Sequence, residues 1–262
     1  MNRIIRHLWF LAVLTAASAA GAAGGPDCSR PMTLALHDHG LLYSADTGAG
    51  IDKDIADEMI RRSGCRITVS VLPRARIWQL IESGALDFSL SGISSEAREK
   101  FAGFAWYFSN KYYLLVRKDA GVHQLSDFEK NEKLSLGIIR SFRYSRNANR
   151  LVDKLSDEQR VSRASQLDPL YEILALNRIQ GMIIEPFDYS QVREGSVREL
   201  TTIIDTDDEP TPHGLIMSKK SISLREQEKW RTLVNEMRAD GTVLRIFEKY
   251  FSPDLAVTLV NF

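Results

Sequence analysis

Apolar and polar positions follow two different periods along this chain. In Asp52–Ser63, Ile55, Met59 and Ile60 recur with the helical period, and Gly64 can end the helix. Between such segments lie short apolar runs that are typical of buried strands. These runs are Met32–Leu36, Ile67–Leu72, Leu86–Leu90, Tyr112–Arg117, Leu134–Ile139, Gly181–Ile184, Leu200–Ile204 and His213–Ser218. Strands that alternate with helices in this way predict an α/β fold in which helices cover a mainly parallel sheet.

The order of the elements predicts two lobes. Further helices are predicted over Ala75–Ser83, Asp127–Asn131, Phe142–Leu155, Leu170–Arg178, Leu224–Ala239 and Thr242–Phe251. No internal repeat, low-complexity tract or long flexible linker divides the sequence. We therefore expect two lobes joined by two hinge crossings, near Val116–Ala120 and Glu209–Gly214. Residues 24–117 and 214–262 would form the first lobe, and residues 118–213 the second.

Residues 1–23 have the pattern of a cleavable secretory signal peptide. A basic start with Arg3 and Arg6 precedes the apolar segment Leu8–Thr15, and small residues with A-x-A spacing follow. The apolar segment is too short to span a membrane, which takes about 20 residues. A buried N-terminal helix and a retained anchor are the alternatives. Because no cysteine directly follows the small residues, we expect no lipid anchor. The A-x-A signal, together with a single pair of cysteines, suggests export to a bacterial periplasm.

The charge of the chain is balanced, with 34 basic and 34 acidic residues. Two of the basic residues fall in the predicted signal peptide, so the exported protein is close to neutral. A nucleic acid or another polyanion is therefore not an expected partner.

Cys28 and Cys65 are the two cysteines of the chain. An even number of cysteines in an oxidising compartment favours a disulfide. Each cysteine precedes an apolar run, and two adjacent parallel strands would bring the starts of these runs together. We therefore expect a disulfide between them, and two free buried thiols are the alternative. The lack of a C-x-x-C motif and of clustered histidines argues against a redox or metal role.

The segment Leu86–Phe108 carries the strongest chemical signal. A predicted strand runs into the Ser- and Gly-rich turn Ser91–Ser95, and Arg98 follows shortly after. Small hydroxyl residues, free backbone N–H groups and a guanidinium can converge on an anion. A surface ion pair with Glu96 or Glu99 is the alternative for this arginine. The pattern predicts a site for a small anionic or zwitterionic molecule.

Four stretches resemble one known family in their order and spacing. They are Gly50–Gly64, Ile81–Phe108, Leu176–Pro186 and Ala239–Phe251. In these stretches the chain resembles the extracellular solute-binding proteins of family 3, the periplasmic amino-acid-binding proteins of ABC transporters. The resemblance implies a two-lobe periplasmic-binding-protein fold of type II, whose lobes close on the ligand.

The resemblance also implies roles for individual residues. Arg98 matches the arginine that grips the ligand carboxylate. Ser91, Gly92 and Ser94 lie in the matching loop that supplies hydroxyl and N–H donors. Glu185 matches an aspartate that receives the ligand ammonium group, and an ion pair across the hinge is its alternative.

Further positions complete the expected ligand site. Asp38 lies where the family places residues that select the ligand side chain, and Ser141 and Phe142 match a helix start that touches the carboxylate. Arg74, at the expected cleft mouth, is a candidate to select an acidic ligand, with a surface position as the alternative. Tyr43 is a candidate to stack on the ligand, although aromatic residues more often belong to a core.

Three features depart from the family pattern. The turn between Gly92 and Arg98 is one residue shorter than usual, and Glu185 is one methylene longer than an aspartate. Arg140–Arg143 stands where the family has a small Gly-Thr pair. The sequence therefore leaves open which serine of the turn faces the ligand and to which class the ligand belongs.

The sequence predicts binding rather than catalysis. It contains no G-x-S-x-G, H-E-x-x-H or P-loop motif, and His37 and His39 have no third ligand at a recognisable spacing, so we expect neither a metal nor a cofactor. We expect a monomer that captures a polar amino acid and delivers it to the permease of an ABC transporter in the inner membrane. The alternatives are an enzyme resembling cyclohexadienyl dehydratases, with Glu185 as general acid, and a ligand-sensing module for a membrane receptor.

Overall fold

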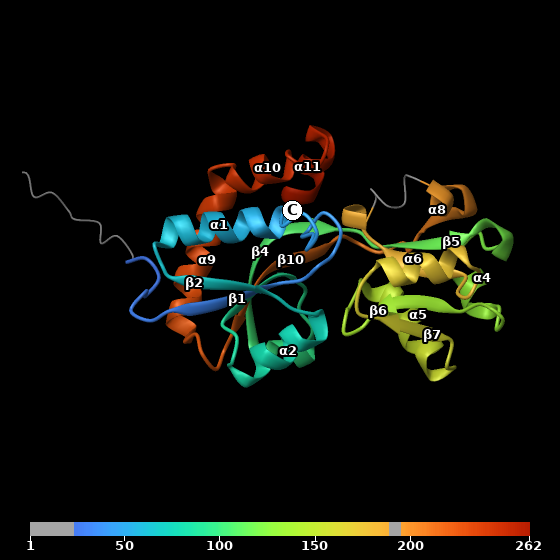
Figure 1. Cartoon of the computed structure of the whole chain (residues 1–262), viewed down its shortest axis with the longest axis horizontal. Helices are drawn as coiled ribbons and strands as arrows, with labels where there is room; N and C mark the ends of the chain where they lie inside the picture. Colours follow the sequence, from blue (N-terminus) through green and yellow to red (C-terminus); the bar gives the residue numbers. More distant parts are fainter. Residues whose placement is uncertain (1–23, 189–194) are drawn as a thin grey trace, which may run out of the picture.

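The computed structural model describes residues 24–188 and 195–262, and the predicted signal peptide lies outside these residues. Two five-stranded sheets lie side by side, and each forms a lobe with helices around it (Figure 1). The first sheet, in the order β2-β1-β3-β10-β4, contains β1 (Met32–Leu36), β2 (Ile67–Val71), β3 (Phe88–Gly92), β4 (Ala102–Asn110) and β10 (Thr211–Ser218). The second, in the order β7-β6-β8-β5-β9, contains β5 (Tyr113–Arg117), β6 (Leu136–Ile139), β7 (Val161–Ala164), β8 (Gly181–Ile184) and β9 (Thr201–Asp205).

Both sheets combine parallel and antiparallel pairs. In the first sheet β2, β1 and β3 are parallel, and β10 is antiparallel to β3 and β4. In the second sheet β7, β6 and β8 are parallel, and β5 is antiparallel to β8 and β9. The predicted α/β fold class is confirmed. Each sheet is mixed, because the strands that follow the crossings enter in the antiparallel direction.

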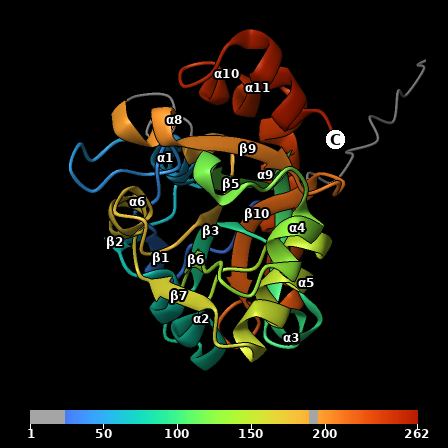
Figure 2. The same cartoon turned by 90° about the vertical axis from the view of Figure 1, so that its right-hand side faces the viewer.

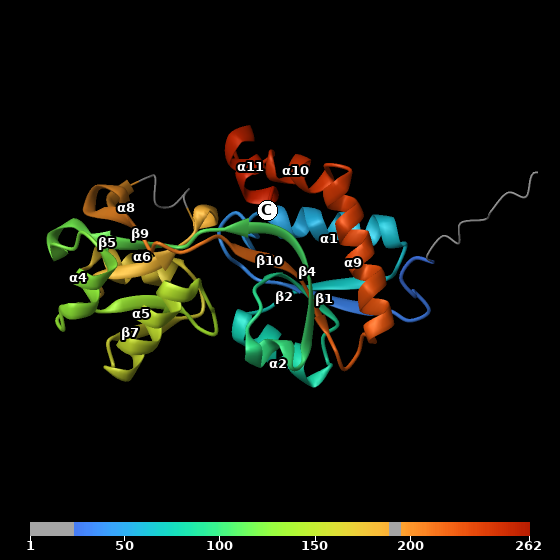
Figure 3. The same cartoon turned by 180° about the vertical axis from the view of Figure 1, so that it is seen from behind.

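Helices cover both faces of the first sheet because successive side chains of a strand point to opposite faces. Leu34 and Leu36 pack on one face, and Ala35 packs on the other with α2 (Arg74–Ser83). The helices on the first face are α1 (Ile51–Ser63), α9 (Leu224–Ala239), α10 (Thr242–Phe247) and α11 (Pro253–Val260). Figure 3 shows α1, α10 and α11 on one side of the strands and α2 on the other.

The second lobe repeats this arrangement with shorter helices. Leu114 and Val116 share a core with α4 (Leu125–Lys130) and α5 (Arg146–Asp157), whereas Leu115 packs with α6 (Asp168–Ala175) on the other face. The remaining elements are α3 (Glu96–Glu99), α8 (Gly195–Leu200) and the 3-10 turns η1 (Lys118–Ala120) and η2 (Pro186–Asp188). Figure 2 views the molecule from the side of this lobe.

The chain passes between the sheets at two points, which Figure 1 shows near its centre. β4 ends at Asn110 and β5 begins at Tyr113, and later β9 ends at Asp205 and β10 begins at Thr211. The first crossing therefore lies before the predicted boundary between residues 117 and 118. The reason is that β5 pairs with β8 and β9 of the second sheet.

Besides the two crossings, the residues that follow β8 also contact the first lobe. Phe187 is fully buried in the core of the first lobe, with its ring centroid 5.1 Å from that of Phe108. Its carbonyl oxygen accepts a hydrogen bond from the N–H of Leu41 at 3.0 Å. Gly40, with φ of +50°, approaches the same carbonyl so closely that a Cβ would lie 2.4 Å from the oxygen. The end of β8 is thus held by the first lobe.

Several predicted elements differ from the structure at their ends. The predicted helix Phe142–Leu155 begins only at Arg146, because residues before it form a turn. The predicted helix Thr242–Phe251 ends at Phe247, and β4 was not predicted as a strand. Among the described residues, no helix is both long enough and apolar enough to cross a membrane.

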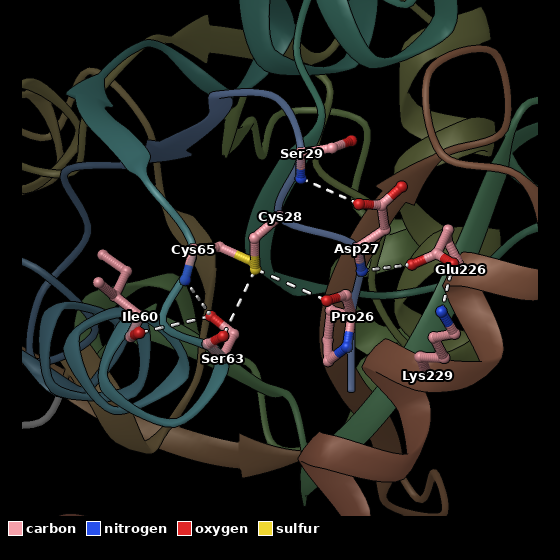
Figure 4. Close-up of a disulfide and its surroundings, with 9 residues drawn as sticks. All are labelled: Pro26, Asp27, Cys28, Ser29, Ile60, Ser63, Cys65, Glu226 and Lys229. Atoms are coloured by element: carbon pink, nitrogen blue, oxygen red, sulfur yellow. Dashed lines mark hydrogen bonds and ion pairs between the residues drawn. A yellow bond between two sulfur atoms is a disulfide. The ribbon is translucent and has the colours of Figure 1, made fainter. Parts of the chain in front are cut away.

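Cys28 and Cys65 form the expected disulfide, with their Cα atoms 4.8 Å apart (Figure 4). The two cysteines precede β1 and β2, which pair in parallel from Met32 and Ile67 onward. This geometry confirms the sequence prediction that adjacent strand starts bring the cysteines together. The disulfide ties the N-terminal segment to the connection between α1 and β2.

Candidate ligand-binding site

A cavity lies between the two lobes, beside the crossing segments. Its empty volume is about 310 Å³, including the open space at its mouth. The first lobe lines it with Leu42, Arg74, Trp78, Ser91, Gly92, Ile93 and Arg98. The second lobe and the crossings contribute Tyr112, Ser141, Phe142, Arg143, Glu185 and His213.

Arg98 connects the two lobes at this cavity. Its Nη1 donates to the carbonyl oxygen of Ile93 at 2.9 Å, and its Nη2 donates to the carbonyl oxygen of Ser141 in the other lobe at 2.8 Å. The guanidinium lies over the ring of Trp78, 3.9 Å from its centroid. Burial lowers the pKa of Arg98 to about 9, and the positive charge of Arg74 adds to this effect. The side chain is therefore a cation in a poorly hydrated place.

Arg74 lies deeper in the cavity, at the first position of α2, and only 4% of it is exposed. Its Nη1 donates to the carbonyl oxygen of Leu90 at 3.0 Å. Its guanidinium carbon is 5.5 Å from the ring centroid of Phe142. Burial lowers the pKa of Arg74, although the negative charge of Asp52 opposes this effect. Within the described part of the chain, neither Arg74 nor Arg98 forms an ion pair with a carboxylate.

The end of β3 has an unusual backbone conformation at the cavity wall. Ser91 has φ of 51°, a left-handed value that residues other than glycine rarely adopt. Its hydroxyl donates to Oδ1 of Asp52 at 2.6 Å, and its N–H donates to the hydroxyl of Tyr107 at 2.9 Å. The next residue is glycine because a Cβ at Gly92 would lie 2.3 Å from the side chain of Ile216. Both donors of Ser91 are thus used within the first lobe, by Asp52 and Tyr107.

Glu185 directly follows β8 and is held by groups of the first lobe. Its Oε1 lies 2.8 Å from Nε2 of His39, and its Oε2 accepts a hydrogen bond from Nδ2 of Asn110 at 3.0 Å. Asp188 accepts the backbone N–H of Glu185 at 3.0 Å, and its other oxygen is 3.5 Å from Nε2 of His39. The structure therefore shows the cross-hinge pair that the sequence left as the alternative for Glu185.

The electrostatics of this cluster follow from burial and close pairing. Burial alone would lower the pKa of His39, but the charge of Asp188 and the bond to Glu185 outweigh it and raise the pKa. Burial alone would raise the pKa of Glu185, but the bond from His39 and its charge lower it. Burial, with the charge of Glu185 adding to it, raises the pKa of Asp188 to about 7. His39 and Glu185 therefore each favour the charged form of the other.

The turn before α5 inserts an aromatic ring between the lobes. Ser141 has φ of 62°, and Phe142 follows with its ring centroid 5.0 Å from that of His39 and 5.5 Å from that of His37. The expectation that a helix starts at Ser141 is wrong, since α5 begins five residues later. The turn presents a carbonyl oxygen to Arg98 and an apolar ring to the first lobe.

Most residues predicted to contact the ligand line this one cavity, namely Arg74, Ser91, Gly92, Arg98, Ser141, Phe142 and Glu185. Asp38, Tyr43 and Ser94 do not. The carboxylate of Asp38 instead accepts bonds from the N–H of Ala45 at 3.0 Å and from Nε2 of Gln166 at 3.2 Å. Tyr43 belongs to the hydrophobic core of the first lobe.

Other lining residues were not predicted from the sequence. Tyr112 and His213 lie at the ends of the two crossings, and the Tyr112 hydroxyl is 3.2 Å from Nε2 of His213. Burial lowers the pKa of His213 to about 4, so the ring is neutral at pH 7. Ligand sites prefer the junction of two domains, and this rule would have pointed to both residues. No group of three or more His, Cys, Asp or Glu side chains suited to a metal ion exists among the described residues.

Comparison with known proteins identifies the family. The family model described as bacterial extracellular solute-binding proteins, family 3, matches residues 37–253. No curated protein sequence matches the chain.

Solved structures share the fold at low sequence identity. An ancestral arginine-binding protein bound to arginine has a TM-score of 0.73 and 19% identity, over 86% of this chain and 100% of the other. A substrate-binding protein of an ABC uptake transporter from Streptococcus pneumoniae, with bound histidine, has a TM-score of 0.69 and 16% identity, over 84% of this chain and 92% of the other. A histidine kinase sensor domain has a TM-score of 0.72 and 12% identity, over 85% of this chain and 96% of the other. The chain belongs to the bacterial extracellular solute-binding proteins of family 3.

Proposed function

We propose that this protein captures a small solute with a carboxylate group between its lobes, in the bacterial periplasm, and delivers it to the permease of an ABC transporter. Membership of the family supports the role in capture. One observation supports a ligand with a carboxylate group. Arg74 and Arg98 line a single cavity, and neither pairs with a carboxylate of the described residues. A ligand carboxylate would supply the missing counter-charge through charge-assisted hydrogen bonds.

Closure of the two lobes provides the mechanism of capture. Arg98 contacts Ser141 of the second lobe, and Glu185 pairs with His39 of the first. A solute that touches both lobes binds the closed form better than the open form, and this difference in affinity shifts the population toward closure. The closed form is then the state that the permease recognises.

The geometry of Glu185 supports binding without turnover. A general acid at this position would need a raised pKa. Although burial acts in that direction, the bond and charge of His39 lower the pKa instead. Both oxygens of the carboxylate are also occupied, by His39 and Asn110. We therefore assign no catalytic role to the cavity.

Thermal unfolding of the chain from residue 24, with a panel of amino acids and small carboxylates, tests this proposal. A solute at 100 times its Kd stabilises the folded state by about 2.7 kcal/mol. Arg98→Ala removes at least two charge-assisted bonds, each of about 1.5 kcal/mol or more, so binding weakens at least ~100-fold.

The matched control is Arg76→Ala. Arg76 is exposed on the same lobe, where its side chain bonds only to Gln79 among the described residues. Its variant retains the affinity of the unmodified chain. Unchanged affinity in Arg98→Ala would contradict the assignment of the carboxylate site.

A further inference from the structure

We propose that the preferred ligand is a small dicarboxylate without an ammonium group. The inference rests on the proposed capture function and narrows its substrate class. It follows from the charges that face the cavity and from the partners that each of them already has. Four charged side chains line the cavity: Arg74, Arg98, Arg143 and Glu185.

Two of these four charges are already compensated inside the protein. Arg143 pairs with Asp153 at 3.1 Å. Glu185 pairs with His39 at 2.8 Å and accepts a second bond from Asn110. These two charged groups therefore require nothing from a ligand.

The other two charges, on Arg74 and Arg98, have only neutral partners among the described residues. Arg98 donates to two backbone carbonyl oxygens, and Arg74 donates to one. A buried cation without a counter-ion is costly, because neutral dipoles replace its hydration only in part. Burial lowers the pKa of both groups, which is the expected consequence of this cost. Two anionic groups from a ligand would relieve both sites.

A ligand ammonium group, in contrast, finds no free carboxylate here. Glu185 already pairs with His39, and each of its oxygens accepts a bond, so an ammonium group would compete with His39 for the same negative charge. Asp52 does not line the cavity, and its Oδ1 already accepts bonds from the hydroxyls of Ser91 and Tyr107. An ammonium group would therefore lose its hydration beside two guanidinium groups. The charge pattern selects against zwitterionic amino acids with neutral or basic side chains.

Three solutes with the same five-carbon chain separate these contributions. Glutarate carries two carboxylates, L-glutamate adds an ammonium group, and L-glutamine keeps the ammonium group with only one carboxylate. Isothermal titration at pH 7 should give Kd values that rise in this order, by at least about 10-fold per step, or about 1.4 kcal/mol. L-arginine should bind more weakly than glutarate.

The outcomes distinguish this inference from the proposed function. If L-glutamine or L-arginine binds as tightly as glutarate, the dicarboxylate class is overturned and capture of a carboxylate solute stands. If no solute in this set or in the wider panel binds, both are overturned.

Arg74→Met provides a second test. The variant should bind glutarate about 10- to 100-fold more weakly and L-glutamine no more weakly than the unmodified chain does. Arg76→Met is the matched control, since this arginine is exposed two positions along α2, and it should leave both affinities unchanged. Circular dichroism establishes that each variant is folded, and the three-solute comparison stands without any variant. Equal weakening for both solutes in a folded Arg74→Met would contradict a second carboxylate site at Arg74.

Discussion

Replacing Glu185 with Gln removes the negative charge that faces His39 between the two lobes. The side chain has almost the same size, so the change is electrostatic. In the native protein Oε1 of Glu185 lies 2.8 Å from Nε2 of His39, and both side chains are about 3% exposed. Removing one partner of a buried ion pair costs about 3–5 kcal/mol.

The structure sets the expected loss for Glu185→Gln at the lower end of this range. Asp188 remains 3.5 Å from His39, and the imidazole can also release its proton. We expect the free energy of unfolding to fall by about 3 kcal/mol. For a chain of this length, about 2–4 °C per kcal/mol gives a decrease in Tm of about 6–12 °C.

The loss depends on pH in a defined direction. The pKa of His39 is raised above 6.5, so its contribution is full below that pH and disappears as pH rises through the folded-state pKa. The pKa of Glu185 is lowered below 4.5, so its contribution is full above that pH and disappears in stronger acid. The difference in Tm between the two proteins should therefore be largest between about pH 4.5 and 6.5.

Scanning calorimetry at pH 5.5 and pH 9 measures this difference. Asp57→Asn is the control because Asp57 pairs with Lys53 on the surface, where both side chains are at least one-third exposed. Its loss should stay below about 1 kcal/mol at either pH. A Glu185→Gln loss as small as that of the control, or one that grows at pH 9, would refute the charged pair.

Three further predictions concern the disulfide, a buried acid and turnover. Replacing Cys28 and Cys65 with serine opens the loop that the disulfide closes, whose ends are separated by 37 positions in the sequence. The free energy of unfolding, measured in urea, should fall by about 4 kcal/mol. A decrease below about 1 kcal/mol would contradict a stabilising disulfide. Because the pKa of Asp188 rises from 3.8 to about 7 on folding, it makes stability fall as pH rises between these values. The Tm of Asp188→Asn, relative to that of the unmodified chain, should therefore rise from pH 4 to pH 7. A difference in Tm that stays constant over this range would contradict the raised pKa of Asp188. Incubation with prephenate should yield no phenylpyruvate, and its formation would contradict binding without turnover.

Periodicity alone predicted the elements that are amphipathic or uniformly apolar. Met32–Leu36, Gly181–Ile184 and Leu224–Ala239 have the same bounds in the structure as in the prediction. Ala102–Asn110 was not predicted as a strand, although it is buried along nearly its whole length. The late start of α5 also has a long-range cause, since the turn before it contacts the first lobe through Phe142.

The parts of the site that could be predicted are those whose residues lie close together in the sequence. The strand end at Ser91 and the arginine that follows it both reach the cavity. The partners of Glu185 could not be read in the same way, because His39 and Asn110 are 146 and 75 residues away from it. Pairing between residues so far apart in the sequence depends on how the two lobes pack. It cannot be predicted from the spacing of these residues in the sequence.

A crystal structure of the chain from residue 24, with the tightest-binding solute of the panel, would locate the carboxylate site. We expect the solute in the cavity between the lobes, with a carboxylate within hydrogen-bond distance of the Arg98 guanidinium. A solute bound instead in the separate hollow beside Asp38 and Gln166, or between the lobes without contact to Arg98, would contradict it.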